Sequence, residues 1–434
     1  MSLPTFKHGI HPSDDKERTA HLSVQRMPFG ERFVMLLGQH IGGPSKATVA
    51  VGDAVLRGQT IGKAGGFVSS ALHSPVTGKV VSIERCRHPM GNMLPAVVIE
   101  ADPWDDQKMH PAAPFTPDPA GFVSRIQQGG IVGLGGAAFP SHVKYALPEG
   151  KRCKVLVLNG CECEPMLTSD HRTMVEHPER VLRGIELVAE ALGAEKAVIG
   201  VENNKPDAMN ALNDAMGTRS LPIEVKPLEV KYPQGAEKVL IKALFGVEVP
   251  AGKLPLDLEF VVNNVSTMVA VADWVELGIP LVDRTVTVTG PAVARPANLR
   301  VPIGTSIRDV LTYCGAELED VFVVMGGPMM GMPVTALDAP ILKGTSGLLV
   351  FRKSDLAVEP AGPCIRCGRC LEACGYSLNP SLFGRLARAG YVEEMETWNV
   401  MDCMECGACT WSCPSEIPLV QLIKSAKLQI RSRK

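Results

Sequence analysis

The chain has 434 residues, of which 45% are hydrophobic and 21% are charged, and its formal net charge is −2. This length predicts about two to four domains. The near-neutral charge argues against a nucleic-acid-binding protein, which needs a strongly basic domain. No apolar run approaches the roughly 18 residues of a membrane span, and residues 1–15 lack the apolar core of a signal peptide. We therefore expect a cytoplasmic chain whose membrane contacts are peripheral or run through partner subunits.

Short apolar runs separated by Gly-Asp, Arg-Gly and Thr-Gly turns predict a small β domain over residues 1–110; the runs cover 49–52, 55–62 and 78–83. Their order resembles the barrel-sandwich hybrid of biotinyl and lipoyl carriers. True carriers hold a modifiable lysine at a hairpin tip, and the equivalent hairpin near His73 and Ser74 has none. We therefore expect a structural or docking domain that carries neither lipoyl nor biotin.

Helical and strand patterns alternate over residues 120–280 and predict an α/β core. Helices are expected over 120–128, 180–192 and 207–216, and strands over 154–158, 197–201 and 260–262. Five prolines over residues 103–119 predict a linker in front of this core. Residues 283–340 predict a compact α+β unit with strands over 284–290 and 321–325 and a helix over 306–314, and residues 341–360 are expected to bridge to the C-terminal part.

Eight of the thirteen cysteines lie between residues 364 and 413, in two runs of the spacing C-x2-C-x2-C-x3-C. Crowding at one end of a large chain indicates metal binding in a reducing compartment rather than a disulfide scaffold. Three thiolates on a tight loop can hold three corners of a cubane, and in two-cluster ferredoxins the fourth cysteine of a run ligates the other cluster. Zinc also uses C-x2-C pairs, but a twofold repeat of this kind is a poor zinc pattern.

The cysteine repeat therefore predicts a domain with two [4Fe–4S] clusters over residues 355–430. One cluster is assigned to Cys364, Cys367, Cys370 and Cys413, and the other to Cys403, Cys406, Cys409 and Cys374. Gly375 follows Cys374 where a proline is usual, which leaves the chain freer at that point without removing a ligand. A helix is expected over residues 417–427.

A glycine-rich stretch over residues 133–144 precedes a short helical pattern. Glycines let backbone N–H groups approach a phosphate closely, but this stretch alone is more typical of a tight turn. Three other polar stretches strengthen the interpretation as a ligand site; they cover residues 159–165, 231–238 and 263–267. The first and third directly follow apolar strands, and ligands of open α/β sheets bind at the carboxyl ends of strands.

Together these four stretches resemble the FMN- and NADH-binding subunit of respiratory complex I and its relatives. The resemblance implies that non-covalent FMN is held by Gly133, Gly135, Gly136, Lys144, Asn159, Glu162, Gly235, Asn263, Asn264 and Thr267. It further implies that Phe139, Glu164 and Glu237 face NADH, the two glutamates as catalytic residues. Ala138 stands where that family has glycine, and Cys161 where it has a flavin-contacting aspartate. Cys161 and Cys163 are expected to be ordinary thiols.

The whole chain resembles the RnfC family. The matching segments run in order from Gly9-Ile-His-Pro through Arg32-Phe-Val, Gln39-His-Ile-Gly, the glycine-rich stretch and Met325-Gly-Gly-Pro-Met-Met-Gly to Cys413-Pro-Ser-Glu-Ile-Pro. The implied architecture is a multidomain α/β and α+β chain. It holds a barrel-sandwich hybrid, a complex-I-flavoprotein-like domain, an SLBB-like β-grasp unit and a two-[4Fe–4S] ferredoxin-like domain. RnfC proteins lie at the cytoplasmic face of the bacterial inner membrane as peripheral subunits.

The resemblance to the RnfC family also implies a function. These proteins oxidise NADH, or reduce NAD⁺, and relay single electrons within an NADH:ferredoxin oxidoreductase complex that moves Na⁺ or H⁺. The implied partners are the subunits RnfA, RnfB, RnfD, RnfE and RnfG, with ferredoxin reached indirectly. A hydride carries two electrons and an iron–sulfur cluster takes one, so a flavin between them is chemically required.

Two alternatives remain at this level. A cobalamin reductase of the propanediol-utilisation type shares the flavin and cluster domains, but its flavin loop lies near the N-terminus, whereas here the sandwich-like domain comes first. A passive electron-relay subunit would keep the clusters and lack NADH oxidation. Only Ala138 and Cys161 favour that second alternative.

Overall fold

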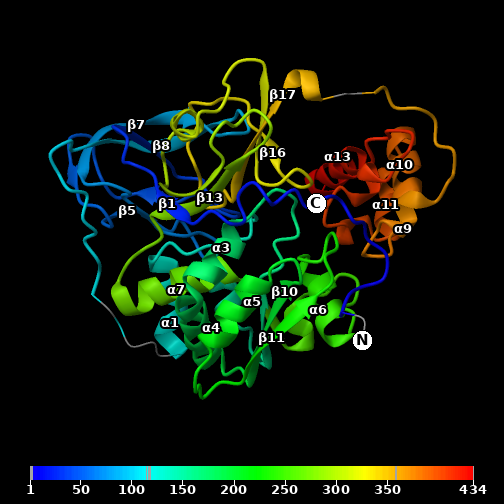
Figure 1. The fold of residues 1–434 in the computed structure, drawn as a ribbon, viewed down its shortest axis with the longest axis horizontal. Coiled ribbons are helices and arrows are strands. Elements are labelled where there is room, and N and C mark those ends of the chain that lie inside the picture. The colour runs from blue at the N-terminus through cyan, green and yellow to red at the C-terminus, as the bar shows by residue number, and fades with distance from the viewer. Residues whose placement is uncertain (1–2, 114, 116–118, 357–358, 434) are drawn as a thin grey trace.

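The computed structural model describes residues 3–113, 115, 119–356 and 359–433, so part of the predicted proline-rich linker, including Pro114 and Pro117, lies outside the described residues. Four units follow one another along the chain (Figure 1). The N-terminal segment starts beside the α/β unit, passes the C-terminal unit and then reaches the β-rich part of the molecule (Figure 1). The N-terminal segment therefore touches units that lie far from it in sequence.

The first unit is a sandwich of two small antiparallel sheets. One sheet has the order β2 (Arg32–Leu36), β8 (Met93–Ala101), β7 (Gly78–Arg87) and β4 (Ala54–Val55); the other has β3 (Lys46–Ala47), β5 (Thr60–Lys63) and β6 (Leu72–His73). Phe33, Ile61 and Val97 are fully buried between them. The prediction of a strand over 49–52 is wrong. The chain turns there because Gly52 has a φ of +97° and the Asp53 carboxylate accepts a hydrogen bond from Ala50 N at 2.8 Å.

The second unit is a parallel four-stranded sheet of order β11 (Ile223–Leu228), β10 (Lys196–Glu202), β9 (Val155–Asn159) and β12 (Phe260–Asn264). Its helices are α1 (Pro119–Gln128), α2 (Ser141–Tyr145), α3 (Ser169–Glu176), α4 (Pro178–Leu192), α5 (Pro206–Asp214), α6 (Glu237–Phe245) and α7 (Val265–Leu277). Successive residues of β9 face opposite sides of the sheet, so Leu156 and Leu158 join the core that contains α4 and α7, while Val155 and Val157 join the core that contains α6. The predicted α/β core is confirmed.

The third unit is a six-stranded sheet of order β1 (Val24–Arg26), β14 (Ala297–Pro302), β13 (Asp283–Thr289), β17 (Gly347–Arg352), β15 (Val321–Met325) and β16 (Met332–Pro333), with α8 (Ile307–Tyr313) beside it. The predicted strands over 284–290 and 321–325 and the helix over 306–314 are present. Residues 341–360 do more than bridge. They contribute β17, whose buried residues 347–350 pair in parallel with β13 and antiparallel with β15.

The fourth unit is helical, with α9 (Arg369–Glu372), α10 (Pro380–Ala389), α11 (Val392–Thr397), α12 (Ala408–Trp411) and α13 (Leu419–Ser432). Phe383, Met395 and Ile423 form its small core. The helix expected over 417–427 is present as α13, which begins two residues later at Leu419 and continues to Ser432. In the described part of the chain, no helix is long and apolar enough to cross a membrane.

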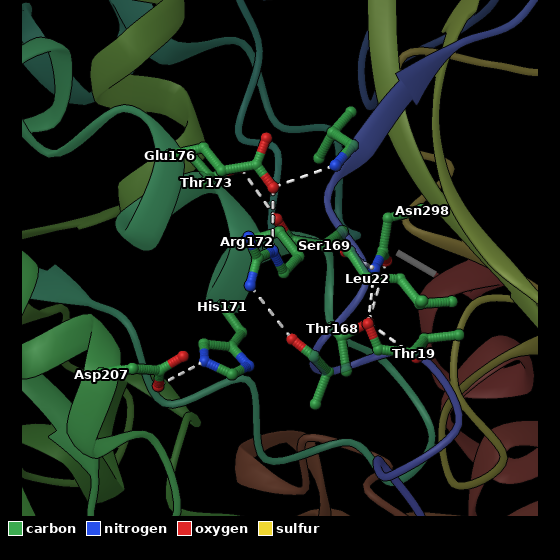
Figure 2. Close-up of polar contacts among 12 residues, drawn as sticks. Thr19, Leu22, Thr168, Ser169, His171, Arg172, Thr173, Glu176, Asp207 and Asn298 are labelled. Carbon is green, nitrogen blue, oxygen red and sulfur yellow. Dashed lines mark hydrogen bonds and ion pairs between the residues drawn. The ribbon is translucent and has the colours of Figure 1, made fainter.

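A polar network fastens the N-terminal segment between the second and third units (Figure 2). Asn298 Nδ2 on β14 donates to the carbonyl oxygens of Thr19 and Leu22 at 2.9 and 3.1 Å. On the other side Arg172 of α3 donates to Ala20 O at 3.2 Å, and Glu176 accepts from Val24 N at 2.9 Å (Figure 2). The start of the chain thus fixes α3 against the six-stranded sheet.

Candidate functional site

The carboxyl ends of β9 and β12 meet at one edge of the parallel sheet. Asn159 and Asn264, the last residues of these strands, are register partners. The two strands are neighbours in space but not in sequence, and ligands of open α/β sheets bind at such a point. The turn after β9 holds Glu162 and Glu164, and Thr267 follows the end of β12.

All four predicted ligand-binding stretches meet at this edge. Thr267 Oγ1 accepts a hydrogen bond from Leu134 N of the glycine-rich loop at 3.0 Å. Asn159 Nδ2 donates to Gly235 O at 2.7 Å. These two contacts join segments separated by 133 and 76 residues.

The glycine-rich loop forms an open cradle. Gly133 N donates to Phe139 O at 2.8 Å and closes the loop at its base. Gly136 has a φ of +108°, and a Cβ added there would meet no atom within 4 Å. Within the described residues the N–H groups of Gly135 and Gly136 donate no hydrogen bond. Free N–H groups on a tight glycine turn suit a phosphate, so this loop fits the FMN that its resemblance implies.

The two asparagines at the end of β12 have different tasks. Asn264 Oδ1 accepts from Ser266 N and Thr267 N at the start of α7, at 2.9 and 3.3 Å, while its Nδ2 donates to Asp170 at 2.6 Å. Asn263 is 5% exposed, and its Oδ1 accepts from the Tyr145 hydroxyl at 3.0 Å. Its Nδ2 is buried and has no partner among the described residues. Because a buried donor without a partner is costly, Asn263 is suited to a ligand that supplies an acceptor.

Glu162 caps a helix in the structure. Its carboxylate accepts from Ser169 Oγ, Asp170 N and His171 N at 3.1, 2.8 and 3.0 Å, all at the start of α3. Acidic groups are favourable at a helix N-terminus. Glu162 lies in the turn after β9, as the sequence predicts. In the structure its carboxylate also caps the N-terminus of α3.

Asp170 and Arg284 are two buried charges at the site that sequence reasoning missed. Burial, and then the neighbouring Glu162 carboxylate, raise the pKa of Asp170 to about 6. Burial lowers the pKa of Arg284 to about 10, and its guanidinium donates to Leu134 O in the glycine-rich loop. Arg284 reaches the loop from β13, so the third unit helps to shape the cradle.

Lys144 and Glu237 pair with each other in the structure. The Lys144 ammonium also donates to Val262 O at 3.0 Å. The sequence assigns Lys144 to the FMN phosphate and Glu237 to NADH, and these assignments stay predictions. The pair shows that the two side chains are within reach of each other at the strand ends.

Glu164 is bound to the third unit. Its carboxylate accepts from Met329 N at 3.0 Å and from Met330 N at 2.8 Å. Burial raises the pKa of Glu164 to about 6, against the lowering effect of these two N–H groups. Its predicted role toward NADH stays a prediction, whereas its hold on the loop before β16 is a property of the fold.

Lys16 organises the acidic turn from the inside. Its buried ammonium donates to the carbonyl oxygens of Glu162, Glu164 and Leu167 at 3.0, 2.8 and 2.5 Å. Burial, and then repulsion from Lys205, lower the pKa of Lys16. No local signal in the sequence connects this lysine to a turn that follows a strand of another unit.

Four cysteines from both runs line one pocket. Cys374, Cys403, Cys406 and Cys409 all border it, with Phe383, Val420 and Ile423 among the apolar residues around them. Burial, and then the thiols of Cys403, Cys406 and Cys374, raise the pKa of Cys409 to about 12. We call these four residues the enclosed set. Their shared pocket and soft donors fit the cluster that the sequence assigns to them.

Two of the other four cysteines lie at the surface. The pKa of Cys370 is raised by burial and also by the neighbouring thiols of Cys413, Cys367 and Cys364. Cys364 and Cys367 are exposed, whereas Cys370 is buried. We call this group the exposed set. In the described residues no three His, Cys, Asp or Glu side chains are placed to hold a single metal ion; a cubane spreads its four thiolates over four irons.

The enclosed set adjoins the turn after β9. The Tyr232 hydroxyl donates to Cys406 O at 2.7 Å. Tyr232, Cys163, Met329, Cys406 and Ala408 belong to one apolar cluster. A Cβ on Gly407 would lie 3.0 Å from Met329 O, so the close approach favours glycine there.

Gly375 is explained by a similar close approach. A Cβ at this position would lie 2.9 Å from the ring of Phe6 and 3.5 Å from the side chain of Val239. The N-terminal segment and α6 therefore cover the chain just after Cys374. The unusual glycine allows this packing.

Comparison with family models matches each unit in turn. The models are the RnfC barrel-sandwich hybrid domain over residues 4–103, the Nuo51 FMN-binding domain over 126–273, the SLBB domain over 285–333 and the 4Fe-4S dicluster domain over 360–417. A solved NAD⁺-reducing [NiFe]-hydrogenase chain has a similar fold, with a TM-score of 0.51 at 21% identity, over 75% of this chain and 70% of that one. Fold and sites thus define an electron-transfer subunit with an FMN-binding domain and a dicluster domain.

Full-length relatives identify the family. The chain is 42% identical to a subunit of the "Proton-translocating ferredoxin:NAD(+) oxidoreductase complex" of Clostridium ljungdahlii, over 99% of this chain and 95% of the relative. It is 41% identical to the corresponding subunit of the "Na(+)-translocating ferredoxin:NAD(+) oxidoreductase complex" of Acetobacterium woodii, over 98% and 97%. The chain belongs to the RnfC family, whose members are subunits of these ion-translocating oxidoreductase complexes. The resemblance derived from the sequence motifs is therefore confirmed.

Proposed function

We propose that this chain is the electron-input subunit of an Rnf-type complex, where it oxidises NADH or reduces NAD⁺ at a bound FMN and passes single electrons to two [4Fe–4S] clusters. The observation that carries the proposal is the direct contact between Tyr232, beside the strand-end turns, and Cys406 of the enclosed set. FMN, when bound, exchanges a hydride with NADH and single electrons with the clusters.

The residues of the strand-end site have distinct tasks in this proposal. Gly135 and Gly136 offer N–H groups to the FMN phosphate, and Asn263 offers its unpaired Nδ2 to the ring or the ribityl chain. Thr267 and Arg284 hold the loop through Leu134. Glu164 and Glu237 are the acidic groups assigned to the NADH side.

The enclosed and exposed sets each hold one [4Fe–4S] cluster in this proposal, and each closes its site with the fourth cysteine of the other run. We further propose peripheral attachment to the cytoplasmic face of the inner membrane through the other Rnf subunits. The names of the relatives support ferredoxin and NAD⁺ as redox partners of the complex.

Flavin and iron analysis combined with rapid-mixing spectroscopy tests the proposal. We expect about one FMN and about eight irons per chain after reconstitution, and NADH should bleach both the flavin and the iron–sulfur absorbance. If NADH leaves the FMN-loaded protein unbleached, the chain is a passive relay and the proposal fails.

A further inference from the structure

The loop that carries Cys364 and Cys367 lies on the surface of the iron–sulfur domain. Both cysteines are exposed, and Ile365 between them is 65% exposed. By contrast, Cys406 in the enclosed set contacts Tyr232 and Met329 of the other units. The two sets therefore face different neighbours, one toward the strand-end site and the other toward solvent.

Two arginines are close in sequence to the exposed cysteines: Arg366 lies between them and Arg369 follows Cys367 by two residues. Arg366 and Arg369 are both exposed, and neither makes a hydrogen bond or ion pair through its side chain with any residue that the structure describes. On the same domain Arg433 and Lys427 are paired with Glu393 and Glu405. Arg385 and Arg388 on α10 also have no side-chain partner among the described residues, but neither belongs to a cysteine run. A charge left unpaired beside a redox centre is available to a partner of opposite charge.

Exposed apolar side chains lie on the two short helices that carry Cys370 and Cys409. Leu371 on α9 is 38% exposed and Trp411 on α12 is 55% exposed, and these two short helices pack against each other. Aromatic residues and arginine are enriched in protein interfaces. Complexes between electron-transfer proteins are transient and bury a smaller surface area than stable protein complexes, so a small exposed surface is sufficient. Ile365, Arg366, Arg369, Leu371 and Trp411 are hereafter the exit face; Glu372 is its exposed acidic neighbour on α9.

We propose that the exit face docks an acidic, one-electron redox protein and that electrons leave the chain through the exposed set. This inference rests on the proposed function and deepens it by naming the order of the cysteine sets and the chemistry of the partner. NADH loses a hydride, which is two electrons and one proton, and becomes NAD⁺. The proton is released to water at the NADH side. The two electrons leave one after the other through the exit face, and each reduces one oxidised centre of the docked protein. No covalent bond forms between the proteins.

Charge reversal tests the exit face. The double variant R366E/R369E, reconstituted with FMN and iron, is compared with R385E/R388E, which reverses two exposed arginines on α10 of the same domain. Each is mixed with membranes from cells that lack this protein, and NADH-driven reduction of the membrane redox centres is followed. At low salt we expect R366E/R369E to be at least about 10-fold slower than wild type. R385E/R388E should stay within about twofold, and added salt should slow wild type more than R366E/R369E.

Integrity is measured on the isolated variants by iron content and by bleaching with NADH, both of which should match wild type. A soluble, anionic paramagnetic chelate provides a second measurement without any substitution, because it should speed the EPR relaxation of one cluster signal and leave the other unchanged. Equal relaxation of both signals would overturn the assignment of the exposed set.

Three outcomes of the charge-reversal assay contradict the exit face. Equal slowing of both variants shows a net-charge effect, and no slowing shows that electrons leave elsewhere. Binding to phosphatidylglycerol vesicles is measured for wild type and R366E/R369E. If R366E/R369E loses this binding but transfers electrons to the membranes at the wild-type rate, the face binds lipid. If NADH does not reduce even the wild-type protein, the proposed function fails. In that case the clusters are reduced with dithionite, the excess dithionite is removed, and the charge-reversal assay is repeated with this reduced protein as the electron donor. The exit face is thus tested independently of the proposed function.

Discussion

The two cysteine runs have one spacing but stand in different surroundings. The enclosed set shares a pocket with Phe383 and adjoins Tyr232 and Met329. The exposed set presents Cys364 and Cys367 to solvent next to Arg366 and Arg369, whose side chains have no partner among the described residues. Identical ligand patterns can therefore serve different steps, because the neighbouring units decide which set receives electrons and which delivers them.

Cys374→Ala should have the largest effect on the difference between the two cysteine sets. It removes one thiolate of the enclosed set, so we expect iron to fall from about eight to about four per chain and one cluster EPR signal to disappear. Cys314→Ala is the matched control, because Cys314 is buried in the core of the third unit and belongs to neither run. Retention of about eight irons in Cys374→Ala would contradict the assignment of this cysteine.

Iron removal should separate the two sets by rate. A chelator reaches exposed ligands first, so we expect biphasic loss in which half of the iron leaves at least about 10-fold faster than the rest. In Cys374→Ala only the fast phase should remain. A single phase in wild type, followed by the absorbance of the iron–chelator complex, would show that the sets are equally accessible.

Glu164→Gln tests the contact between Glu164 and the loop of Met329 and Met330, beside the enclosed set, through the pH dependence of stability. Burial raises the folded-state pKa of Glu164 to about 6 from an ordinary 4.5. A raised pKa means that its stabilising contribution is complete below about pH 4.5 and is lost as the pH rises through 6. Since glutamine cannot ionise, we expect wild type to lose roughly 2 kcal/mol relative to the variant between about pH 3.5 and about pH 7.

Thermal unfolding of wild type and Glu164→Gln across this pH range is the measurement. Glu179→Gln, at an exposed position on α4, keeps Glu164 and should follow wild type at every pH. A constant offset between wild type and Glu164→Gln at every pH would contradict a buried, titrating carboxyl.

Tyr232→Phe should have the smallest effect on stability, and it compares the redox midpoints of the two clusters directly. It removes the hydrogen bond to Cys406 O and should lower the free energy of unfolding by about 1 kcal/mol. A hydrogen bond near a cluster ligand also tunes its potential, so redox titration by EPR should show a shifted midpoint for one cluster only. Tyr313→Phe on α8 should shift neither. Equal shifts of both midpoints would contradict the conclusion that Tyr232 adjoins the enclosed set alone.

Much of the α/β unit could be predicted because apolar periodicity is local. The strand predicted over 154–158 follows from an apolar run and the helix over 180–192 from an amphipathic pattern, and the structure has them as β9 (Val155–Asn159) and α4 (Pro178–Leu192). β17 was missed as a strand because residues 347–352 look like one more short apolar run until their partners β13 and β15 are known. Pairing of this kind depends on segments far apart in sequence.

The sequence by itself determined the family, the order of the four units, the cysteine spacing and the four polar stretches that meet at the strand ends. Each of these depends on residue types over short distances along the chain. Only the tertiary structure decided that Lys16 and Arg284 shape the site, that Glu164 holds Met329, and that one cysteine set is enclosed and the other exposed. Burial and contacts between distant segments arise from packing, which no local pattern records.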